Sequence, residues 1–378
     1  MEIENKFKIL ASHENLEIAD DFECHVAEPA FKNRISIAKL PGGKSIKLAK
    51  TLLTSACERN CYYCPFRAGR NYRRETLRPS ELAKHSFSLY QKGLIHGIFI
   101  SSGIVGGGRR TQDLLIQTAE ILRHKYGYKA YLHLKIMPGA DNEQVLRTMQ
   151  LADRVSINLE GPNEETLRKL APQKALYDEL LTPLRWVNAI RSNQPGSLGW
   201  NGRWPSATTQ FVVGGAGETD HALLQTSDFL YKRLKLGRVY YSAFTPIEDT
   251  PLDNLPPESP ARKLRLYQAS FMLRDYGFIF EDLPFDNEGN LPLYEDPKLI
   301  WAKHNLMANP VEINKADKSE LLRVPGIGHK TAQYLMKVRN INKIRSLEDL
   351  RKIGLWSDRF IPFILLDGKR IPQQLILF

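Results

Sequence analysis

The chain has 378 residues, of which 42% are hydrophobic and 25% are charged, as is ordinary for a globular protein long enough for two domains. Its longest apolar runs fall far short of the ~20 residues that a membrane-spanning helix needs, and its first residues lack the basic flank and apolar stretch of a secretory signal, which argues against a membrane protein and against secretion. Four cysteines give no disulfide framework and favour a cytoplasmic location, while a net charge of +11 favours a polyanionic partner such as nucleic acid.

Short β-rich runs alternate with longer helical patterns from about residue 43 to residue 282. The expected strands are Ile46–Leu53, His96–Ser101, Tyr131–Ile136, Arg154–Leu159, Ala207–Val213 and Arg238–Phe244. The expected helices are Pro79–Lys92, Thr111–Tyr126, Asn142–Leu151, Asn163–Leu170, Tyr177–Ser192, His221–Leu234 and Ala261–Tyr276. About six βα units of this kind predict an α/β fold, a partial TIM-like (β/α)6 barrel, with functional loops at the C-terminal ends of its strands.

Composition divides the chain into four expected segments. Residues 1–42 are expected to form a leader that packs on the barrel, and residues 43–285 the barrel itself. Residues 286–305 are rich in Pro, Asn and acidic residues and are expected to form a linker. Residues 306–378 are expected to form a small all-α domain, with 13 Lys and Arg against 7 Asp and Glu. More than half of the excess positive charge therefore lies in the last fifth of the chain.

Three cysteines with the spacing C-x3-C-x2-C follow the first expected barrel strand: Cys57, Cys61 and Cys64. Three thiolates on one short loop hold three irons of a cubane cluster and leave the fourth iron open to another ligand. A structural zinc site is the alternative, but such sites usually take four ligands. The nearest other candidates, Cys24 with His25 upstream and His85 downstream, do not have zinc-ribbon spacing. The pattern therefore favours a 4Fe–4S cluster.

The basic tail contains Pro325-Gly326-Ile327-Gly328 between two short predicted helices, of which the second covers residues 329–339. The glycines expose backbone N–H groups at a helix N-terminus, which is a phosphate site. Lys330 adds charge and Thr331 adds a hydroxyl group, so these six residues are expected to bind a nucleic-acid backbone. A degenerate second copy follows at residues 346–354. A helical hairpin that binds a protein is the alternative.

The cysteine loop, with Tyr63 before its last thiolate, resembles the signature loop of the radical S-adenosylmethionine (SAM) superfamily, and the tail resembles the helix-hairpin-helix motif of DNA-binding and repair proteins. From about residue 45 to residue 345 the chain resembles the radical SAM/helix-hairpin-helix group, which is associated with DNA modification or repair and often with a uracil-DNA glycosylase-like partner. The other segments that carry this resemblance are Leu52-Leu-Thr54, Ser101-Ser-Gly-Ile104, Ser156-Ile-Asn-Leu-Glu160 with Leu170-Ala-Pro172, and Tyr240-Tyr-Ser242.

This resemblance implies a 4Fe–4S cluster and SAM as cofactors. The residues implied to bind SAM are Tyr63, Ser101, Ser102, Gly103, Ser156, Asn158, Glu160, Val213, Gly214 and Ser242. Asn158 and Glu160 suit ribose hydroxyls or the methionine amine. Ser101-Ser102-Gly103 stands where the family often has Gly-Gly-Glu, so hydroxyls and carbonyls replace a carboxylate unless the segment is an ordinary turn. The glycines from Gly214 let the backbone approach adenine.

The resemblance also implies a reaction in which an electron, delivered by a partner such as flavodoxin or ferredoxin, cleaves SAM to a 5′-deoxyadenosyl radical that takes hydrogen from a nucleotide in DNA. An arginine group at residues 67–78 is expected to steer phosphates toward the barrel. Cys24, Tyr240 and Tyr241 are candidate radical relays, although a lone cysteine more often packs in a core.

Two other functions stay open: an enzyme that modifies tRNA or other RNA, and a DNA-binding protein whose cluster is structural or redox-sensing.

Overall fold

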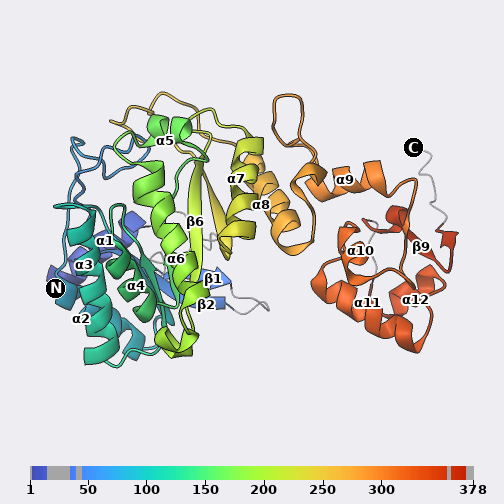
Figure 1. Cartoon of the computed structure of the whole chain (residues 1–378), viewed down its shortest axis with the longest axis horizontal. Coiled ribbons are helices and arrows are strands. Elements are labelled where there is room, and N and C mark those ends of the chain that lie inside the picture. The colour runs from blue at the N-terminus through green and yellow to red at the C-terminus, as the bar shows by residue number, and fades with distance from the viewer. Residues whose placement is uncertain (1, 15–34, 40–44, 356–358, 372–378) are drawn as a thin grey trace. The chain divides into compact units, whose positions relative to one another are not determined.

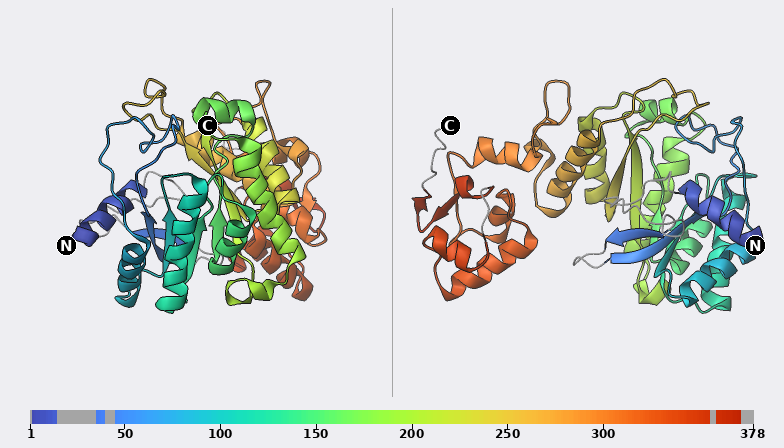
Figure 2. Two further views of the ribbon diagram at one scale, coloured as in Figure 1. Left: turned by 60° about the vertical axis from the view of Figure 1, so that its left-hand side comes forward. Right: turned by 180° about the vertical axis from the view of Figure 1, so that it is seen from behind.

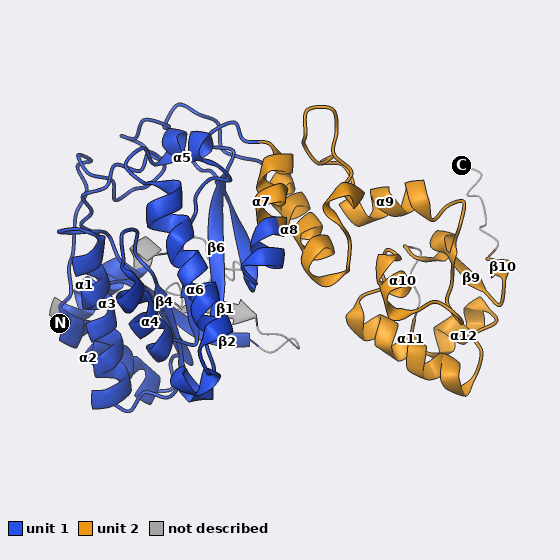
Figure 3. Ribbon diagram, in the orientation of Figure 1, with its two compact units in different colours: residues 1–218, 229–259 blue, residues 219–228, 260–378 orange. Residues whose placement is uncertain are grey.

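The computed structural model describes residues 2–14, 35–39, 45–355 and 359–371. Cys24 lies outside these residues, so its role as a relay stays a prediction. The chain divides into two compact units, residues 1–218 with 229–259 and residues 219–228 with 260–378 (Figure 3). Each unit is described by itself below. None of the described helices is long and apolar enough to cross a membrane.

The first unit is built on a seven-stranded sheet whose strands are neighbours in the order of the chain. Its strands are β1 (Ile35–Lys39), β2 (Ser45–Leu52), β3 (Gly97–Ser101), β4 (Tyr131–Lys135), β5 (Arg154–Ser156), β6 (Ser206–Val213) and β7 (Arg238–Ala243). β1 pairs antiparallel with β2, and β2 to β7 are all parallel. The six parallel strands curl into a half-barrel, which confirms the predicted fold class (Figure 1).

Helices surround the curled sheet on its outer side (Figure 2). They are α1 (Glu2–Glu14), α2 (Pro79–Gln91), α3 (Gly108–Glu120), α4 (Asn142–Leu151) and α6 (Thr182–Asn193), with π-helical turns at Ile121–Lys125 and Leu176–Leu181. The short helix α5 (Glu164–Leu170) follows β5, and α7 (Asp220–Arg233) begins in the second unit and ends in the first. Local sequence sets their starts. Asp141 accepts a hydrogen bond from the backbone of Gln144 before α4, and Asn163 does the same for Thr166 before α5. Such side-chain caps satisfy backbone N–H groups that have no partner within the helix.

The second unit contains α8 (Pro260–Asp275), the start of α7 and the tail. The tail elements are α9 (Pro297–Asn305), β8 (Val311–Glu312), α10 (Lys318–Arg323), α11 (His329–Ile341), α12 (Leu347–Lys352), β9 (Ile364–Leu366) and β10 (Lys369–Arg370). Two features differ from the sequence expectation. α9 lies within the expected linker, and the tail carries a three-stranded sheet, β10-β9-β8, beside its helices. Asp296 caps α9, and Asp367-Gly368 forms the β9–β10 turn with positive φ at both residues.

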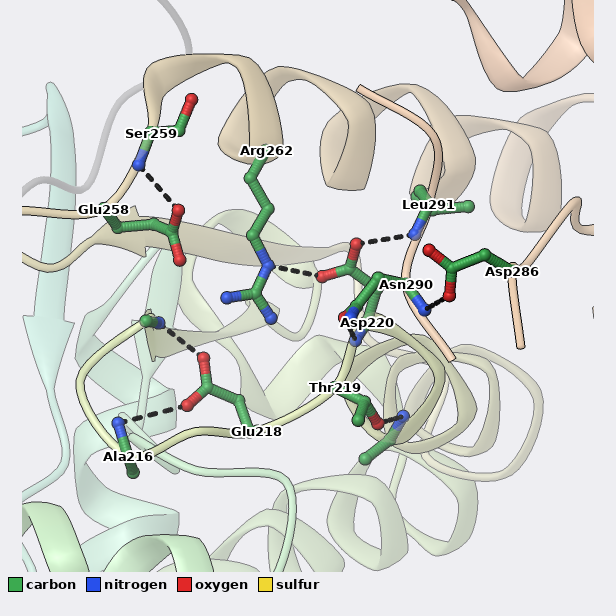
Figure 4. A network of polar contacts seen from close by, with 12 residues as sticks. Ala216, Glu218, Thr219, Asp220, Glu258, Ser259, Arg262, Asp286, Asn290 and Leu291 are labelled. Carbon is green, nitrogen blue, oxygen red and sulfur yellow. Dashed lines mark hydrogen bonds and ion pairs between the residues drawn. The ribbon is translucent and has the colours of Figure 1, made fainter. Parts of the chain in front are cut away.

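The expected linker is also held by hydrogen bonds within the second unit (Figure 4). The buried carboxylate of Asp220, at the start of α7, accepts from Arg262 Nε at 2.7 Å and from the backbone N–H of Leu291 at 2.9 Å. The backbone N–H of Asp220 donates to Asn290 Oδ1 at 3.3 Å. Buried polar groups require such partners. Residues 286–291 therefore form an ordered part of the second unit, packed against α7 and α8.

Candidate cofactor site

The C-terminal ends of the parallel strands line one cavity of about 270 Å³ in the first unit. This end of the sheet is the one that parallel barrels use for function, because the loops after the strands meet there. Leu52 of β2, Lys135 of β4, Val212 of β6 and Ser242 of β7 all contribute to its wall. Segments far apart in the sequence therefore build a single site.

All three cysteines of the loop after β2 line this cavity. Cys61 is 7% exposed, and Cys57 and Cys64 are half-buried. Burial raises the pKa of the Cys61 thiol, an effect that the nearby ammonium of Lys174 opposes. Among the described residues, no three His, Cys, Asp or Glu side chains converge on a point where one metal ion could bind. A cluster does not require this convergence, because each thiolate binds a different iron.

Arg74 holds the cysteine loop in place from inside. Its guanidinium donates to the backbone carbonyls of Ser55 at 2.8 Å, Phe66 at 2.7 Å and Arg67 at 2.8 Å. These carbonyls lie on both sides of the three cysteines, so one planar cation ties the two ends of the loop together. Five N–H donors in a fixed fork make arginine suited to this task. Arg74 is thus a structural part of the loop.

Two other arginines of the group at residues 67–78 also make contacts within the first unit. Arg70 donates from Nε to the carbonyl of Glu248 at 2.8 Å, and Arg73 donates to the carboxylate of Glu75 at 2.8 and 3.0 Å. The sequence pattern suggested a surface that steers phosphates. Arg70, Arg73 and Arg74 thus have partners within this unit, but the Arg73 side chain is 74% exposed, and the steering of phosphates stays a prediction.

The loop after β3 is tied to the cysteine loop by several hydrogen bonds. Ile104 donates its N–H to Cys57 Sγ at 3.4 Å, and the Glu58 carboxylate accepts from the backbone of Gly106 at 2.8 Å and Gly107 at 3.0 Å. Gly103 is required by close approach, since a Cβ there would lie 2.1 Å from the carbonyl oxygen of Ala56. Hydrogen bonds to cluster sulfurs tune the reduction potential, so Ile104 is placed to do this.

The segment after α5 makes a second attachment to the cysteine loop. The N–H of Tyr62 donates to the carbonyl of Leu170 at 2.7 Å, and Asn60 donates its N–H to Gln173 Oε1 at 3.2 Å. Arg59 donates to Glu179 at 2.6 Å. These contacts bring Lys174, the residue after Gln173, into the wall of the cavity. The sequence did not predict Lys174 as a site residue. Only its position beside Leu170-Ala-Pro172 could have drawn attention to it.

Lys174 and Glu160 form an ion pair inside the cavity wall. Lys174 Nζ lies 2.8 Å from Glu160 Oε1, and the side chains are 9% and 3% exposed. Burial lowers the pKa of Lys174, but Cys61 and Glu160 raise it more strongly, so the net shift is upward. The phenol of Tyr63 has a pKa well above its usual value because of burial and of the Glu160 charge. Tyr63 packs against Leu170, Val212 and Phe244.

The structure brings six of the ten expected cofactor residues to the cavity: Tyr63, Ser102, Gly103, Asn158, Glu160 and Ser242. The other four lie elsewhere, for reasons that local geometry explains. Ser101 is buried within β3. β5 ends at Ser156, whose hydroxyl lies 2.9 Å from His133 Nε2, so the expected alternation of faces stops there. Val213 is buried in β6, and Gly214 begins a turn in which its N–H donates to Glu218.

The two tyrosines expected as radical relays lie in β7, outside the cavity wall. The hydroxyl of Tyr240 accepts a hydrogen bond from Arg154 at 3.4 Å. The guanidinium of Arg238 lies over the Tyr240 ring, 5.6 Å from its centroid. Tyr241 is fully buried beside Phe211. Their roles as relays stay predictions.

The expected phosphate hairpin joins α10 to α11 in the second unit. Gly326 has a φ of +80°, and Gly328 is the N-cap of α11. Pro325 and Ile327 are buried, Lys330 is exposed and Thr331 is half-buried. The hairpin therefore anchors its apolar residues in the core, while its glycines and the first turn of α11 lie nearer the surface. This arrangement is the one that helix-hairpin-helix motifs need.

Comparison with known proteins assigns both parts of the chain. Residues 51–230 match the model of the radical SAM superfamily, and residues 307–354 match that of the helix-hairpin-helix motif. No curated protein matches the chain.

Solved structures match at low identity. The FeFe-hydrogenase maturase HydG from Carboxydothermus hydrogenoformans has 17% identity over 60% of this chain and 51% of that chain, with a TM-score of 0.47. Methylornithine synthase (PylB) has 16% identity over 60% of this chain and 61% of that chain, with a TM-score of 0.48. The methyltransferase TsrM from Kitasatospora setae, with cobalamin and a 4Fe–4S cluster bound, has 16% identity over 55% of this chain and 38% of that chain, with a TM-score of 0.41. The chain thus spans less than two thirds of each of these proteins.

A 4Fe–4S cluster and SAM are the cofactors of this superfamily, and the site fits both. Three thiols line one cavity, and the same cavity holds a buried carboxylate oxygen of Glu160 that has no hydrogen-bond partner among the described residues. Cys57, Cys61 and Cys64 are the residues that would hold the cluster. The chain thus contains a radical SAM domain over residues 51–230 and a helix-hairpin-helix motif over residues 307–354.

Proposed function

We propose that this chain is a radical SAM enzyme that modifies or repairs a nucleotide in DNA, which it binds through its helix-hairpin-helix motif. The observation that carries the proposal is the presence in one chain of a cysteine-lined cofactor cavity and a glycine hairpin of the phosphate-binding type. A covalent connection raises the effective concentration of the nucleic acid at the cofactor site, whatever the affinity of each part alone.

The hairpin supports nucleic acid as the substrate class. α11 is 13 residues long, and its positive end follows Gly328 directly. Lys330 and Lys337 are exposed on α11, seven positions apart and therefore on one face. A helix N-terminus with backbone N–H groups and a nearby cation suits one phosphate of a nucleic-acid backbone. Contacts of this kind position the strand without reading its sequence.

When bound, the cluster and SAM supply a 5′-deoxyadenosyl radical by reductive cleavage of SAM. The residues of this chain would hold and enclose these groups. Cys57, Cys61 and Cys64 would hold the cluster, and the N–H of Ile104 donates to Cys57 Sγ, one of the three sulfurs. The apolar cluster of Leu170, Val212 and Phe244, with Tyr63 packed against it, keeps water from one wall of the cavity. Ser102, Asn158 and Ser242 offer hydrogen bonds to a polar ligand.

The proposal includes two protein partners and a location. A small electron-transfer protein such as flavodoxin or ferredoxin supplies the electron, and a uracil-DNA glycosylase-like protein is the partner that the resemblance suggests. Three of the four cysteines are committed to the cluster loop, and such thiols persist in a reducing compartment, which supports a cytoplasmic location.

The test uses the anaerobically reconstituted, reduced protein with SAM and DNA, with a Cys61→Ser variant as control. We expect 5′-deoxyadenosine only from the wild type, and a modified nucleoside in the digested DNA by mass spectrometry. Tighter binding of tRNA than of DNA, with modified nucleosides only in the RNA, would assign the enzyme to RNA. A protein that binds DNA but forms no 5′-deoxyadenosine would have a structural or redox-sensing cluster instead.

A further inference from the structure

The inner face of α11 is fixed by contacts within the second unit. Ala332 and Leu335 are buried on this face. Arg339 donates to the backbone carbonyls of Ile313 at 2.8 Å and of Ala316 at 2.5 Å. Ala332, Leu335 and Arg339 follow one another at intervals of three and four positions, so they lie on one side of the helix. These contacts determine which side of α11 faces away from the unit.

The opposite face of α11 carries four exposed side chains, which form the outer stripe of the helix: Lys330, Tyr334, Lys337 and Ile341. They recur at intervals of four, three and four positions and therefore follow one line along the helix. At about 100° per residue, the middle of this line lies nearly opposite the inner face. Tyr334 is 44% exposed and Ile341 is 80% exposed. The apolar stem of Lys337 stands between them, so a partly apolar surface runs along the helix.

The outer stripe is also cationic, and it begins at the glycine hairpin. α11 has no acidic residue among its 13 residues. Lys330 is the second residue of the helix, which begins after Gly328, and Lys337 lies about 10 Å farther along the axis at about 1.5 Å per residue. Two cations at this distance, on long flexible stems, fit separate phosphates of one strand. The charge of the stripe therefore complements a polyanion that also contacts the hairpin.

Tyr334 stands between the two lysines of the outer stripe. Bases of a single strand stack on exposed aromatic rings of this kind while neighbouring cations hold the strand's backbone. A duplex does not offer this contact, because its bases already stack on one another and expose only their edges in the grooves. Ile341, at the far end of the stripe, adds apolar surface for a further base or sugar. The combination fits unpaired nucleic acid better than a duplex.

We infer that the outer stripe of α11 binds an unpaired segment of the nucleic acid. A base stacks on Tyr334, and Lys330 and Lys337 contact the phosphates on either side of it. The inference rests on the proposed function, because it takes nucleic acid as the substrate class, and it adds that the strand is unpaired where the stripe binds it. An enzyme that acts on a base has to take that base out of the stack, so an unpaired segment suits the proposed chemistry.

The test measures binding by fluorescence anisotropy with the full-length, anaerobically reconstituted protein. One probe is a labelled oligodeoxythymidylate, and the other is a blunt-ended DNA duplex of the same length. Tyr334→Ala removes the ring, whereas Tyr334→Phe keeps the ring and removes only the hydroxyl group. Tyr294→Ala is the matched control, because Tyr294 is an 81% exposed tyrosine of the same unit that lies outside α11.

We expect Tyr334→Ala to weaken binding of the single strand about 10-fold, as the loss of one stacked base does, and to change duplex binding less than about two-fold. Tyr334→Phe and Tyr294→Ala should bind both probes like the wild type. Unchanged single-strand affinity in Tyr334→Ala would overturn the inference. An equal loss for both probes would also overturn it, because the ring would then contact a feature that the single strand and the duplex share.

Competition with poly-L-glutamate distinguishes nucleic acid from an acidic protein partner. Poly-L-glutamate carries negative charge but no bases, so its affinity should be the same for the wild type and Tyr334→Ala. An equal loss of affinity for poly-L-glutamate and for the single strand would assign the stripe to an acidic protein. A protein that binds neither DNA probe would contradict the proposed function together with this inference. Binding of both probes without any dependence on Tyr334 would contradict this inference alone.

Discussion

The cofactor site and the hairpin reach their geometry in opposite ways. The cofactor site draws its residues from the strand ends of the half-barrel, and its cysteine loop is held by partners such as Arg74 and the backbone of Gly106. The hairpin consists of consecutive residues, Pro325 to Gly328, between two helices. A site of the first kind depends on the whole unit, whereas one of the second kind depends on a short local sequence. Variants should therefore separate the two cleanly.

The largest separation is expected for Cys61→Ser. Removal of the most buried of the three thiolates should abolish cluster binding and SAM cleavage, because the remaining two ligands leave a second iron exposed. Iron and sulfide analysis with electron paramagnetic resonance measures the cluster, and fluorescence anisotropy measures DNA affinity. DNA affinity should stay within about two-fold of the wild type, because the phosphate contacts expected of the hairpin do not involve the cysteines. A parallel loss of DNA binding would show that the two sites are not independent.

A smaller but still large effect is expected for Gly103→Ala. The new Cβ would lie 2.1 Å from the Ala56 carbonyl oxygen, so the cysteine loop must shift. Overpacking of this kind costs about 1–3 kcal/mol, and more where backbone is the obstacle. We expect reduced iron content after reconstitution. Gly237→Ala is the matched control, because its Cβ would meet atoms only at 3.5 Å or more. Full cluster loading in Gly103→Ala would contradict the close contact.

Lys330→Glu changes the hairpin and leaves the residues of the cofactor site as they are. Charge reversal beside the N-terminus of α11 should weaken DNA binding about 10-fold and reduce the salt dependence by about one phosphate contact. Cluster content should not change. Lys369→Glu, an exposed lysine on β10, controls for the altered net charge and should have the smaller effect. Equal losses in the two variants would assign binding to overall charge and not to the hairpin.

The smallest effect concerns a lysine that supports the hairpin. Lys298 donates to the carbonyl of Ile327 at 3.0 Å and lies over the ring of Tyr276. Burial lowers its pKa to about 8, although Asp296 opposes the shift. The folded state therefore disfavours the charged lysine. This penalty is fully present below pH 8 and disappears as the pH rises toward the usual value of 10.5.

Relative to Lys298→Met, the wild type should gain stability as the pH rises from about 7.5 to 9.5, by on the order of 1–2 kcal/mol. Hydrogen exchange of the amides in α9 and α11, corrected for intrinsic rates, measures the difference. A gap between wild type and variant that is constant with pH would mean that Lys298 has an ordinary pKa. The cofactor unit serves as the internal control, since its exchange should not depend on this residue.

The sequence predicted the features that repeat or that follow local rules. The alternation of strands and helices, the cysteine spacing and the Gly-x-Gly hairpin are all readable from consecutive residues. The failures share a different cause. The expected alternation stops where β5 ends at Ser156, and Arg74 donates to backbone carbonyls on both sides of the cysteines, which a run of arginines in the sequence does not reveal. Lys174 was missed because only folding brings it to the cysteines.

Two overlooked elements did have local signals. The Asp296-Pro297 pair marks a capped helix start, and Asp367-Gly368 marks a tight hairpin. Both lie in stretches whose composition suggested a linker or a purely helical domain. In these stretches the residues that cap a helix or form a turn predict the structure better than composition does. Composition is an average over many residues, whereas a cap or a turn depends on one or two.

The bonds from Arg74 to the carbonyls around the cysteine loop have a consequence for how the protein acquires its iron. In zinc fingers the metal organises the chain, so that binding and folding are one event. Here the loop is organised by the guanidinium of Arg74 and by the bonds of its own Glu58 carboxylate to backbone N–H groups of the turn after β3, none of which involves iron. Cluster assembly is then the loading of a host that is already folded. We therefore expect that a cluster destroyed by oxygen can be rebuilt on the same molecule without refolding.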